Sequence, residues 1–474
     1  MPITLAYVAA SLEKERINFK LIDSFGEKPV ITKKDKNFLY FGKTDEEIIE
    51  DIDNTKEKRI IVGIFANQLL NHNSIVQIIK KIKKNFLNCK IIILENTQAV
   101  TAYSLRKTKK EFLNLGVDYL IVGEPEVNFA NLIKLIKKSD FETIKEIKGV
   151  ISNEFENNEL EIINNIDDLA FPAWHLFNLK NYWKMNYAHG PLSKNKYLPM
   201  LTSRGCPYPC KFCVVPFTNN RKWRARSSEN IISELKFFKN KYSVLEFHFE
   251  DLNFTVNDRR TKDFCKKLIS SNLNISWKLV AGTKVESMKD EETIKLMAES
   301  GCKYISISPE SGSKEVMKLI EKPFNLDHAI KMVHLMNKYG IKSQACFVLG
   351  YPGEKNIDLK DTRKMIFKLT KNGIDEIALF IISPVPGSAI YSELKGYSNL
   401  SELNFSPTWR KDYKKLFYYR LFFYFYFLFF KSIFYPNKII KQVINFFTKN
   451  FETKMEMVPY KNLEIRKHER EFKK

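Results

Sequence analysis

Between residue 197 and about residue 394, short apolar runs alternate with longer amphipathic segments. Apolar runs rich in β-branched residues and separated by helices are typical of parallel strands that are buried on both faces. Six units of about 25–35 residues each favour a partial (β/α)6 barrel of the TIM type over a complete eight-stranded one. The expected strands are 198–202, 244–250, 275–280, 304–308, 343–349 and 376–382, and the expected helices are 228–240, 258–271, 290–300, 314–320, 326–339 and 359–372.

A second α/β unit is expected in residues 1–145. The alternation there predicts strands at 18–23, 59–65, 90–94 and 118–122, with helices at 45–53, 74–86, 105–115 and 126–138. This pattern indicates a doubly wound, Rossmann-like sheet. The chain opens on a helical segment, 5–15, where such a unit normally opens on a strand, so we expect its first strand to be missing.

Three further regions complete the expected organisation. Residues 146–191 are expected to form a hairpin of 150–153 with 160–163, followed by a linker that is extended near its prolines. Residues 192–395 form the barrel, and residues 396–474 form a helical tail.

Composition places the chain among globular proteins of a reducing compartment. Apolar residues make up 44% and charged residues 28% of 474 residues, which excludes wholesale disorder. Seven cysteines are too few for a disulfide scaffold. The first residues show a helical pattern rather than that of a signal peptide, so a cytoplasmic location is expected.

Three cysteines with a characteristic spacing follow the first expected barrel strand. In the stretch TSRGCPYPCKFC, Cys206, Cys210 and Cys213 have C-x3-C-x2-C spacing, and the prolines between them bend the loop. Three thiolates on one tight loop can bind three irons of a 4Fe–4S cluster and leave the fourth iron open. A structural zinc site instead prefers four ligands in two pairs. The other cysteines stand singly, as buried structural thiols do: Cys89, Cys265, Cys302 and Cys346.

With this motif, residues 197–395 resemble the radical S-adenosylmethionine (SAM) superfamily. The stretches GCKYISISPESGSKEVMKLIEKPF (301–324), CFVLGYPGE (346–354) and SPVPGSAIY (383–391) match as well. The resemblance implies that SAM binds the open iron. It also implies that reductive cleavage of SAM yields a 5′-deoxyadenosyl radical, which removes a hydrogen atom from the substrate. The positions that would contact SAM are Phe212, Glu250, Asp251, Lys284, Ser308, Glu310 and Gly350.

The resemblance assigns roles to several of these residues. Phe212 is expected near the adenine, and Glu250 or Asp251 near the methionyl amine. For Glu310 two roles stay open, a contact to the ribose hydroxyls and a salt-bridged carboxylate at a strand end. Lys284 stands where the family has an Arg, and Lys cannot offer the same planar, two-pronged contact. Cys346 stands where the family has a Gly.

The N-terminal unit resembles the cobalamin-binding domain that precedes this core in one large subfamily. The matching phrases are LAYVAASLE, VGEPEVNFANLI and LAFPAWHLF. Members of that subfamily transfer methyl groups to unactivated carbon, or close and contract rings. The subfamily's cobalt-ligating pattern, D-x-H-x-x-G, is absent, so we expect weak cobalamin binding without a protein His on cobalt, and whether cobalamin binds at all stays open. His72 is expected to be a solvated or helix-capping residue.

The tail is basic and aromatic. Residues 409–474 hold 16 Lys and Arg against 6 Asp and Glu, and 416–430 (LFYYRLFFYFYFLFF) has 11 aromatic residues in 15 positions. A membrane-spanning helix needs about 20 apolar residues without charges. Phe and Tyr beside Lys and Arg instead suit the headgroup interface. We expect amphipathic segments at 416–430 and 439–447 that bind an anionic membrane surface peripherally, on its inner face. A buried cap and a true span are the alternatives.

Three functions compete on these grounds. The first is a radical SAM enzyme that performs methyl transfer or ring and carbon-skeleton chemistry on an apolar, lipid-like small molecule, with an electron donor such as flavodoxin or ferredoxin. The second is a radical SAM RNA-modifying enzyme, which the net charge of +22 would suit. That class has three further cluster cysteines in its N-terminal domain, where this chain has only Cys89, so nucleic acid is not the expected partner. The third is a non-catalytic iron–sulfur scaffold.

Overall fold

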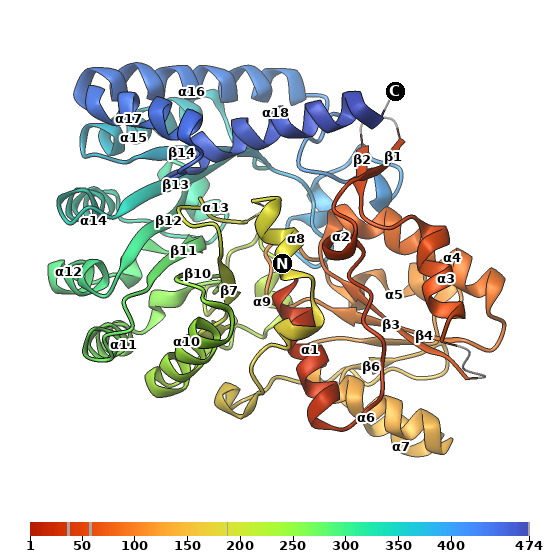
Figure 1. The fold of residues 1–474 in the computed structure, drawn as a ribbon. Helices are drawn as coiled ribbons and strands as arrows, with labels where there is room; N and C mark the ends of the chain where they lie inside the picture. Colours follow the sequence, from red (N-terminus) through yellow and green to blue (C-terminus); the bar gives the residue numbers. More distant parts are fainter. Residues whose placement is uncertain (36–37, 56–58, 187, 473–474) are drawn as a thin grey trace.

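The computed structural model describes the chain except for residues 36–37, 56–58, 187 and 473–474. Two α/β units lie side by side, and helices near the C-terminus form a layer across one end of the molecule (Figure 1). The first helix, α1 (Ile3–Lys14), lies between the two units. Ala6 and Tyr7 pack into the core of the barrel unit, whereas Val8 and Leu12 pack into the core of the N-terminal unit.

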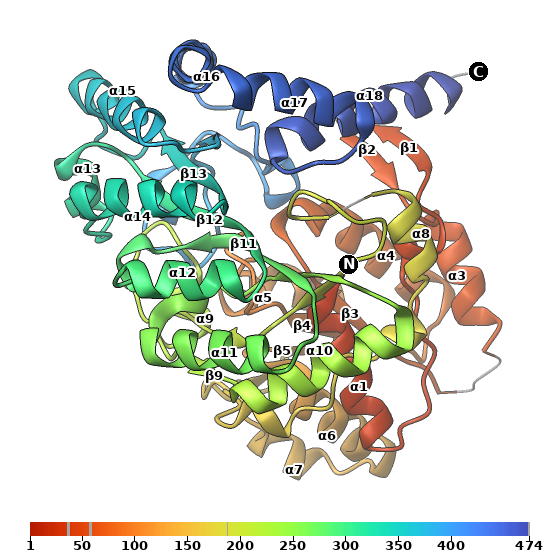
Figure 2. The ribbon, with the colours of Figure 1, turned by 60° about the vertical axis from the view of Figure 1, so that its left-hand side comes forward.

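The barrel unit is one curved sheet of six parallel strands, in the order β14-β13-β12-β11-β10-β7. Its helices lie on the convex side, and the two outer strands do not pair with each other, so the barrel is partial (Figure 2). The strands are β7 (Leu198–Met200), β10 (Glu246–Phe249), β11 (Ser276–Thr283), β12 (Cys302–Glu310), β13 (Lys342–Leu349) and β14 (Glu376–Ile381). The helices are α10 (Ser228–Tyr242), α11 (Asp258–Ser270), α12 (Glu291–Glu299), α13 (Lys314–Leu319), α14 (Leu326–Lys338) and α15 (Asn356–Lys371). Every expected strand and helix of this unit is confirmed, with ends that shift by a few residues.

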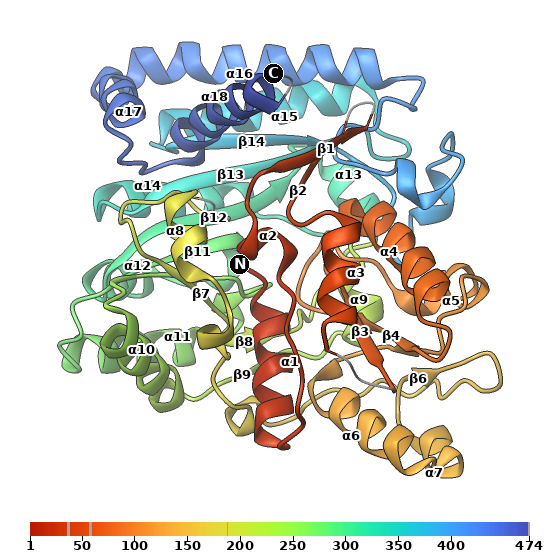
Figure 3. The ribbon, with the colours of Figure 1, turned by 45° about the vertical axis from the view of Figure 1, so that its right-hand side comes forward.

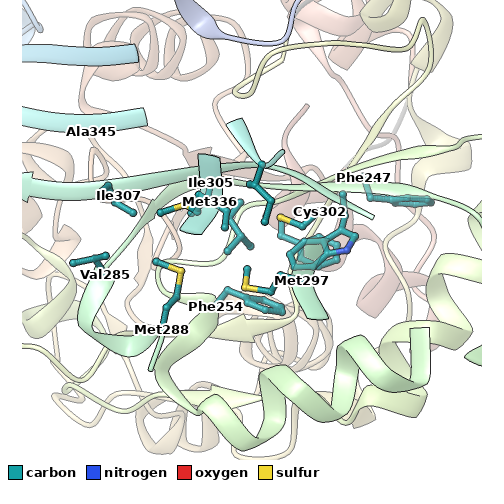
Figure 4. Close-up of a cluster of buried hydrophobic side chains, with 14 of the residues drawn as sticks. Phe247, Phe254, Val285, Met288, Met297, Cys302, Ile305, Ile307, Met336 and Ala345 are labelled. Carbon is teal, nitrogen blue, oxygen red and sulfur yellow. The ribbon is translucent and has the colours of Figure 1, made fainter. Parts of the chain in front are cut away.

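Alternate residues of these strands face the helices and form the main hydrophobic core, as the two-residue period of a strand requires. Phe247, Ile305 and Ala345 belong to this set, and Met297 of α12 belongs to the same cluster (Figure 4). Cys302 lies in the same layer. The intervening residues therefore face the concave side of the sheet, where a barrel enzyme holds its ligands.

The N-terminal unit has a sheet in the order β3-β4-β5-β6. Its strands are β3 (Ile61–Ala66), β4 (Lys90–Glu95), β5 (Tyr119–Ile121) and β6 (Val150–Ile151), of which the first three are parallel and β6 is antiparallel. Helix α1 with α6 (Pro125–Lys138) and α7 (Phe141–Glu146) covers one face, and α3 (Asp45–Asp53), α4 (His72–Asn85) and α5 (Leu105–Asn114) cover the other (Figure 3). Helices on both faces confirm the doubly wound arrangement.

Two predictions for this half are wrong. Residues 18–23 form no strand, because Phe19 packs with the core beside α6 while Ile22 packs with the core on the opposite face, so the segment crosses from one face to the other. The hairpin of 150–153 with 160–163 does not form either. β6 pairs with β5, and Glu161 bridges Gly123 in parallel. An unforeseen hairpin, β1 (Ile31–Asp35) with β2 (Phe38–Phe41), stands apart from the main sheet.

The tail folds into three helices, α16 (Tyr413–Phe434), α17 (Pro436–Thr448) and α18 (Lys454–Phe472). Helix α16 lies along α15 and the outer strand β14, where Phe423 and Phe427 are buried and the Leu379 N–H donates to the Tyr424 hydroxyl at 3.1 Å. Among the described residues, no helix has both the length and the hydrophobicity that a membrane crossing requires.

Two tail lysines face inward, although the sequence suggested that the tail's cations reach headgroups. Lys431 is fully buried and donates to the Asp375 carbonyl oxygen, and Lys438 pairs with the Asp375 carboxylate at 2.9 Å. The exposed side of α16 carries Tyr418, Leu421, Phe422, Phe425, Phe429 and Ile433. One face of the helix is a cap on the barrel, and the opposite face is an apolar stripe.

Candidate cluster site and its surroundings

The three motif cysteines lie between β8 (Ser203–Arg204) and the short helix α9 (Val215–Thr218), directly after the barrel strand β7. All three thiols are free and partly buried. The loop is tight, because the Cys213 N–H donates to the Cys210 carbonyl oxygen at 3.1 Å and the Val215 N–H donates to the Cys213 sulfur at 3.4 Å. Strand β7 thus delivers the motif to the carboxyl end of the barrel, where such folds place their active sites.

The chemistry of these donors fits an iron–sulfur cluster. Burial raises the pKa of Cys210 to about 11, and the nearby Lys322 ammonium opposes this rise. Iron binding displaces thiol protons, and the three thiolates of a cubane bind three different irons. Among the described residues, no three Cys, His, Asp or Glu side chains are placed to hold a single metal ion.

Phe212 forms an aromatic pair with Tyr351 beside the cysteines, with ring centroids 5.6 Å apart. Lys322 lies 5.8 Å from the Phe212 centroid and donates to Glu310 at 2.6 Å. Glu310 has φ of +62°, which is the left-handed region, and it is buried with Lys322. Of its two open roles, the structure shows the salt-bridged carboxylate at a strand end. The Tyr351 hydroxyl is buried without a hydrogen-bond partner among the described residues, which fits a polar ligand beside Phe212.

The acidic pair after β10 is divided between two tasks. Glu250 accepts a hydrogen bond from the His189 ring at 2.7 Å, on the concave side of the sheet. Asp251 is buried and accepts from the Thr202 N–H at 2.7 Å and from the Ser203 hydroxyl at 2.7 Å. Asp251 thus holds the strand that leads into the cysteine loop, whereas Glu250 faces the space beside it.

The Lys284 ammonium forms hydrogen bonds to two neighbouring loop residues. Its ammonium donates to Glu286 at 3.0 Å and to the Pro323 carbonyl oxygen at 2.7 Å, and it lies 5.3 Å from the Tyr208 ring centroid. Because Tyr208 belongs to the cysteine loop, Lys284 braces that loop against the turn after α13.

Ser308 lies close to Gly282 of the neighbouring strand, and Gly350 lies where the start of the tail meets the end of β13. A Cβ on Gly282, which has φ of +96°, would come within 2.6 Å of the Ser308 oxygen. Gly350, with φ of +85°, donates its N–H to Glu354 at 2.5 Å and accepts at its carbonyl from Arg410 at 2.9 Å. The start of the tail therefore closes the carboxyl end of β13.

Several side chains on the concave side of the sheet are partly exposed, and the polar side chains of Gln344 and Glu376 lie behind them. Phe380 is 48% exposed although it lies within a strand, and Val348, Ala378 and Cys346 are partly exposed on the same side. Cys346 lies close enough to Ser306 and Gln344 for weak hydrogen bonds of 3.4 Å. The expectation of a buried structural thiol is confirmed for Cys89, Cys265 and Cys302. Cys346 instead is partly exposed on the concave side of the sheet.

A buried network of charges joins the cysteine loop to the N-terminal unit. Arg204 donates to Glu126 at 2.6 Å, and Arg224 of β9 (Arg224–Ala225) donates to both oxygens of Glu124 at 2.8 and 2.9 Å. All four side chains are at most 10% exposed. This network was not predicted from the sequence. The features that point to it are the two acidic residues of VGEPE, which directly follow a strand, and the Arg two residues before the first cysteine.

Further hydrogen bonds cross the same boundary. The Gly205 N–H approaches the Gln98 side-chain oxygen at 3.4 Å, and the Asn219 side chain donates to the Thr97 carbonyl oxygen at 2.8 Å. Thr97 and Gln98 follow β4, and Glu124 and Glu126 follow β5. The carboxyl end of the N-terminal sheet therefore meets the cysteine loop.

His72 is neither solvated nor free. It is fully buried, with Tyr103 at 3.3 Å from one ring nitrogen and Glu111 at 2.9 Å from the other. The rings of Tyr103 and Phe112 lie against it, each with a centroid distance of 5.6 Å. The predicted solvated or capping role is wrong, because α5 folds over the start of α4 and encloses the imidazole.

Comparisons with known proteins agree with this geometry. Residues 200–366 match the Radical SAM superfamily. The chain is 27% identical over 417 residues to an uncharacterized methyltransferase of Pyrococcus horikoshii, covering 86% of this chain and 81% of that protein. It is 26% identical over 451 residues, with the same coverages, to a cytidylyl-2-hydroxyethylphosphonate methyltransferase of Streptomyces wedmorensis.

Solved structures share the fold at low sequence identity. The radical SAM methyltransferase TsrM of Kitasatospora setae superposes with a TM-score of 0.62 at 14% identity, covering 83% of this chain and 72% of that one. The cobalamin-dependent radical SAM enzyme OxsB superposes with a TM-score of 0.62 at 19% identity, covering 89% of this chain and 53% of that one. The Radical SAM match covers the cysteine loop and most of the partial barrel, and the chain as a whole shares the fold of solved cobalamin-dependent radical SAM enzymes.

Proposed function

We propose that this enzyme is a methyltransferase that binds a 4Fe–4S cluster through Cys206, Cys210 and Cys213, SAM beside it, and cobalamin at the boundary between the two units. The observation that carries the proposal is the pairing of Arg204 with Glu126. It brings the carboxyl end of the N-terminal sheet against the loop that would hold the cluster. Support also comes from relatives named as methyltransferases.

When bound, the cluster and SAM supply one-electron chemistry, and cobalamin supplies a methyl carrier. The chain's own residues position these groups and keep water away. Phe212 and Tyr351 form an aromatic wall beside the cysteines, Glu250 and His189 form a hydrogen-bonded pair on the concave side, and Asp251 fixes the strand before the loop. Phe380 and Val348 would pack against an apolar substrate.

Cobalamin would bind without a protein histidine on cobalt. Both ring nitrogens of His72 are engaged by Tyr103 and Glu111 inside the N-terminal core. The strand-end loops instead present amide and carboxylate groups at the boundary, such as Asn96, Gln98 and Glu124. Electron donors of the flavodoxin or ferredoxin class would reduce the cluster.

We also propose that the apolar stripe on α16 contacts an anionic membrane surface from the cytoplasmic side. Support comes from its six exposed apolar residues, including Phe425 and Phe429, and from the exposed cations Lys411, Lys414 and Lys415 at the start of the helix. Aromatic and basic side chains together suit the headgroup region. A lipid-derived substrate would then reach the barrel from the bilayer.

An RNA-modifying function has weaker support. A tRNA-2-methylthio-N(6)-dimethylallyladenosine synthase of Sulfurihydrogenibium aligns over only 41% of this chain. The tail forms the three helices α16 to α18, which differ from the OB-like domain of that class.

Anaerobic reconstitution of the full chain tests the proposal. The expected results are iron and sulfide bound to the chain, 5′-deoxyadenosine formed from SAM under reduction, and transfer of a deuterated methyl group from SAM to an apolar acceptor. A chain that forms the cluster but never cleaves SAM would contradict the proposed function.

A further inference from the structure

The first turn of α18 enters the concave side of the barrel sheet. The Met455 N–H donates to Glu376 of β14 at 2.7 Å. Beside it, the Lys454 ammonium donates to the Val280 carbonyl oxygen of β11 at 3.3 Å and lies 5.9 Å from the Tyr304 ring centroid on β12. Figure 1 shows α18 running from the β14 side of the barrel toward the β1–β2 hairpin. Lys454, more than 170 positions from β11 in the sequence, therefore lies against the concave side of the sheet.

Among the described residues Lys454 forms no salt bridge, and its ammonium donates to the Val280 carbonyl oxygen at 3.3 Å. Its charge lies near the Glu376 carboxylate and lowers the pKa of that group, against the burial that raises it. The Glu376 carboxylate already accepts from Tyr304 at 2.6 Å, from Gln344 at 3.0 Å and from Met455. The ammonium is half-buried, and an anionic ligand within hydrogen-bond distance of it would gain a charge-assisted hydrogen bond.

The surroundings of Lys454 combine this charge with apolar walls. Cys346 is near enough that the ammonium lowers its pKa, against the burial that raises it to about 11. Val348 and Phe380 continue the same concave face toward the carboxyl ends of the strands. Lys461 lies seven residues further along α18, about 10 Å by helix rise, and donates to the Ala188 carbonyl oxygen at 3.2 Å. The Lys454 ammonium thus lies beside a concave face on which Val348 and Phe380 are apolar and at least partly exposed.

We propose that Lys454 binds an anionic group of the substrate, a carboxylate or a phosphoryl group, on the concave side of the barrel sheet. The apolar part of the substrate would then lie against Phe380 and Val348. This inference deepens the proposed function, because it assigns a substrate class to the same site. It makes Lys454 a binding residue contributed by the tail, and it orients the substrate with its charged end away from the cysteine loop.

Binding of small aromatic anions to the reconstituted full-length enzyme tests the inference. Phenylphosphonate, benzoate and the neutral benzyl alcohol are titrated by ligand-observed NMR into the wild type, Lys454→Gln, Lys454→Arg and Lys467→Gln. Lys467 is the matched control, since it is exposed on the same helix. We expect Lys454→Gln to weaken anion binding at least tenfold, Lys454→Arg to retain it, and Lys467→Gln and benzyl alcohol binding to be unaffected. The stronger of the two anions identifies the group as phosphoryl or carboxylate.

Equal anion affinity of the wild type and Lys454→Gln would overturn the inference, as would an equal loss in Lys467→Gln, which would indicate non-specific charge attraction. Thermal unfolding of each variant shows whether a loss reflects misfolding, and in that case Lys454→Met replaces Lys454→Gln in the titration. Substrate-free SAM cleavage by the wild type is measured in parallel. Failure of cleavage in the wild type would count against the proposed function, while the anion titration would still decide the role of Lys454.

Discussion

Arg204, two residues before the first cluster cysteine, donates a hydrogen bond to Glu126 of the N-terminal unit at 2.6 Å, and both side chains are buried. Breaking one partner of such a pair leaves a buried charge without compensation, at a cost of about 3–5 kcal/mol. The pair therefore couples the stability of the molecule to the placement of the cysteine loop.

We expect Glu126→Gln to lower the free energy of unfolding by about 3 kcal/mol, because Arg204 keeps its charge and retains only the more distant Glu124 carboxylate at 3.7 Å. Denaturant titration of the cluster-free chain measures this. The control is Glu142→Gln, which removes an exposed ion pair with Lys145 and should leave the unfolding curve unchanged. Equal stability of Glu126→Gln and the wild type would refute the coupling.

The cluster assignment predicts that the wild type binds about four irons and four sulfides per chain after anaerobic reconstitution. Replacing Cys206, Cys210 or Cys213 by Ala should abolish this, because each thiolate binds one iron. Iron and sulfide analysis with absorbance near 400 nm reports it. Cys265→Ala is the comparison, since Cys265 lies in the helix-facing core. Retention of the cluster in Cys210→Ala together with its loss in Cys265→Ala would show that the ligands are misassigned.

The enclosure of His72 predicts that cob(II)alamin bound to the wild type shows no nitrogen superhyperfine splitting from a protein His in electron paramagnetic resonance. His72→Ala should leave that spectrum unchanged and lower stability by about 1–3 kcal/mol, because Tyr103 and Glu111 lose a buried partner. A nitrogen splitting that disappears in His72→Ala would contradict this placement.

The stripe on α16 predicts that the enzyme floats with vesicles rich in anionic lipid, and that salt partly reverses this binding. A Phe425→Ser, Phe429→Ser double variant should lose vesicle binding without losing stability, because both side chains are exposed. Phe423→Ser serves as the contrast, since Phe423 faces the barrel and its loss should destabilise the fold. Deletion of 409–474 is unsuitable as a test, because Arg410 and Lys454 contact the barrel strands and the loops that follow them. Flotation of the double variant at the wild-type level would eliminate the stripe as the binding surface.

Burial lowers the pKa of Lys431 from its ordinary value of 10.5 to about 8. Between these values the unfolded chain holds a proton that the folded chain has lost, so folded stability rises with pH from about 8 to 10.5. Lys431→Met should lack this contribution and should be at least as stable as the wild type at pH 7, since an apolar side chain replaces a buried charge. The difference between the two unfolding free energies, followed from pH 7 to 10, measures the effect. Lys415→Met, an exposed site, should show no such difference. A constant difference between Lys431→Met and the wild type over this range would disprove the shift.

The amino-acid sequence by itself determined the six βα units, the three parallel strands of the N-terminal sheet and the cysteine loop. These follow from hydrophobic period and residue spacing, which act over a few residues and are therefore visible in the chain. It failed at 18–23, where a short run that contains Phe19, Leu21 and Ile22 resembles a strand, but Phe19 and Ile22 pack into different cores.

The tertiary structure alone decided which groups meet across long sequence separations. Glu126 reaches Arg204, α5 encloses His72, Lys431 is buried against β14, and Lys454 enters the barrel from the far end of the chain. No local pattern specifies such partners, because the free energy that fixes them comes from burying whole faces of sheets and helices together. A lysine or histidine becomes a surface charge, a buried brace or a ligand-binding group only through that packing.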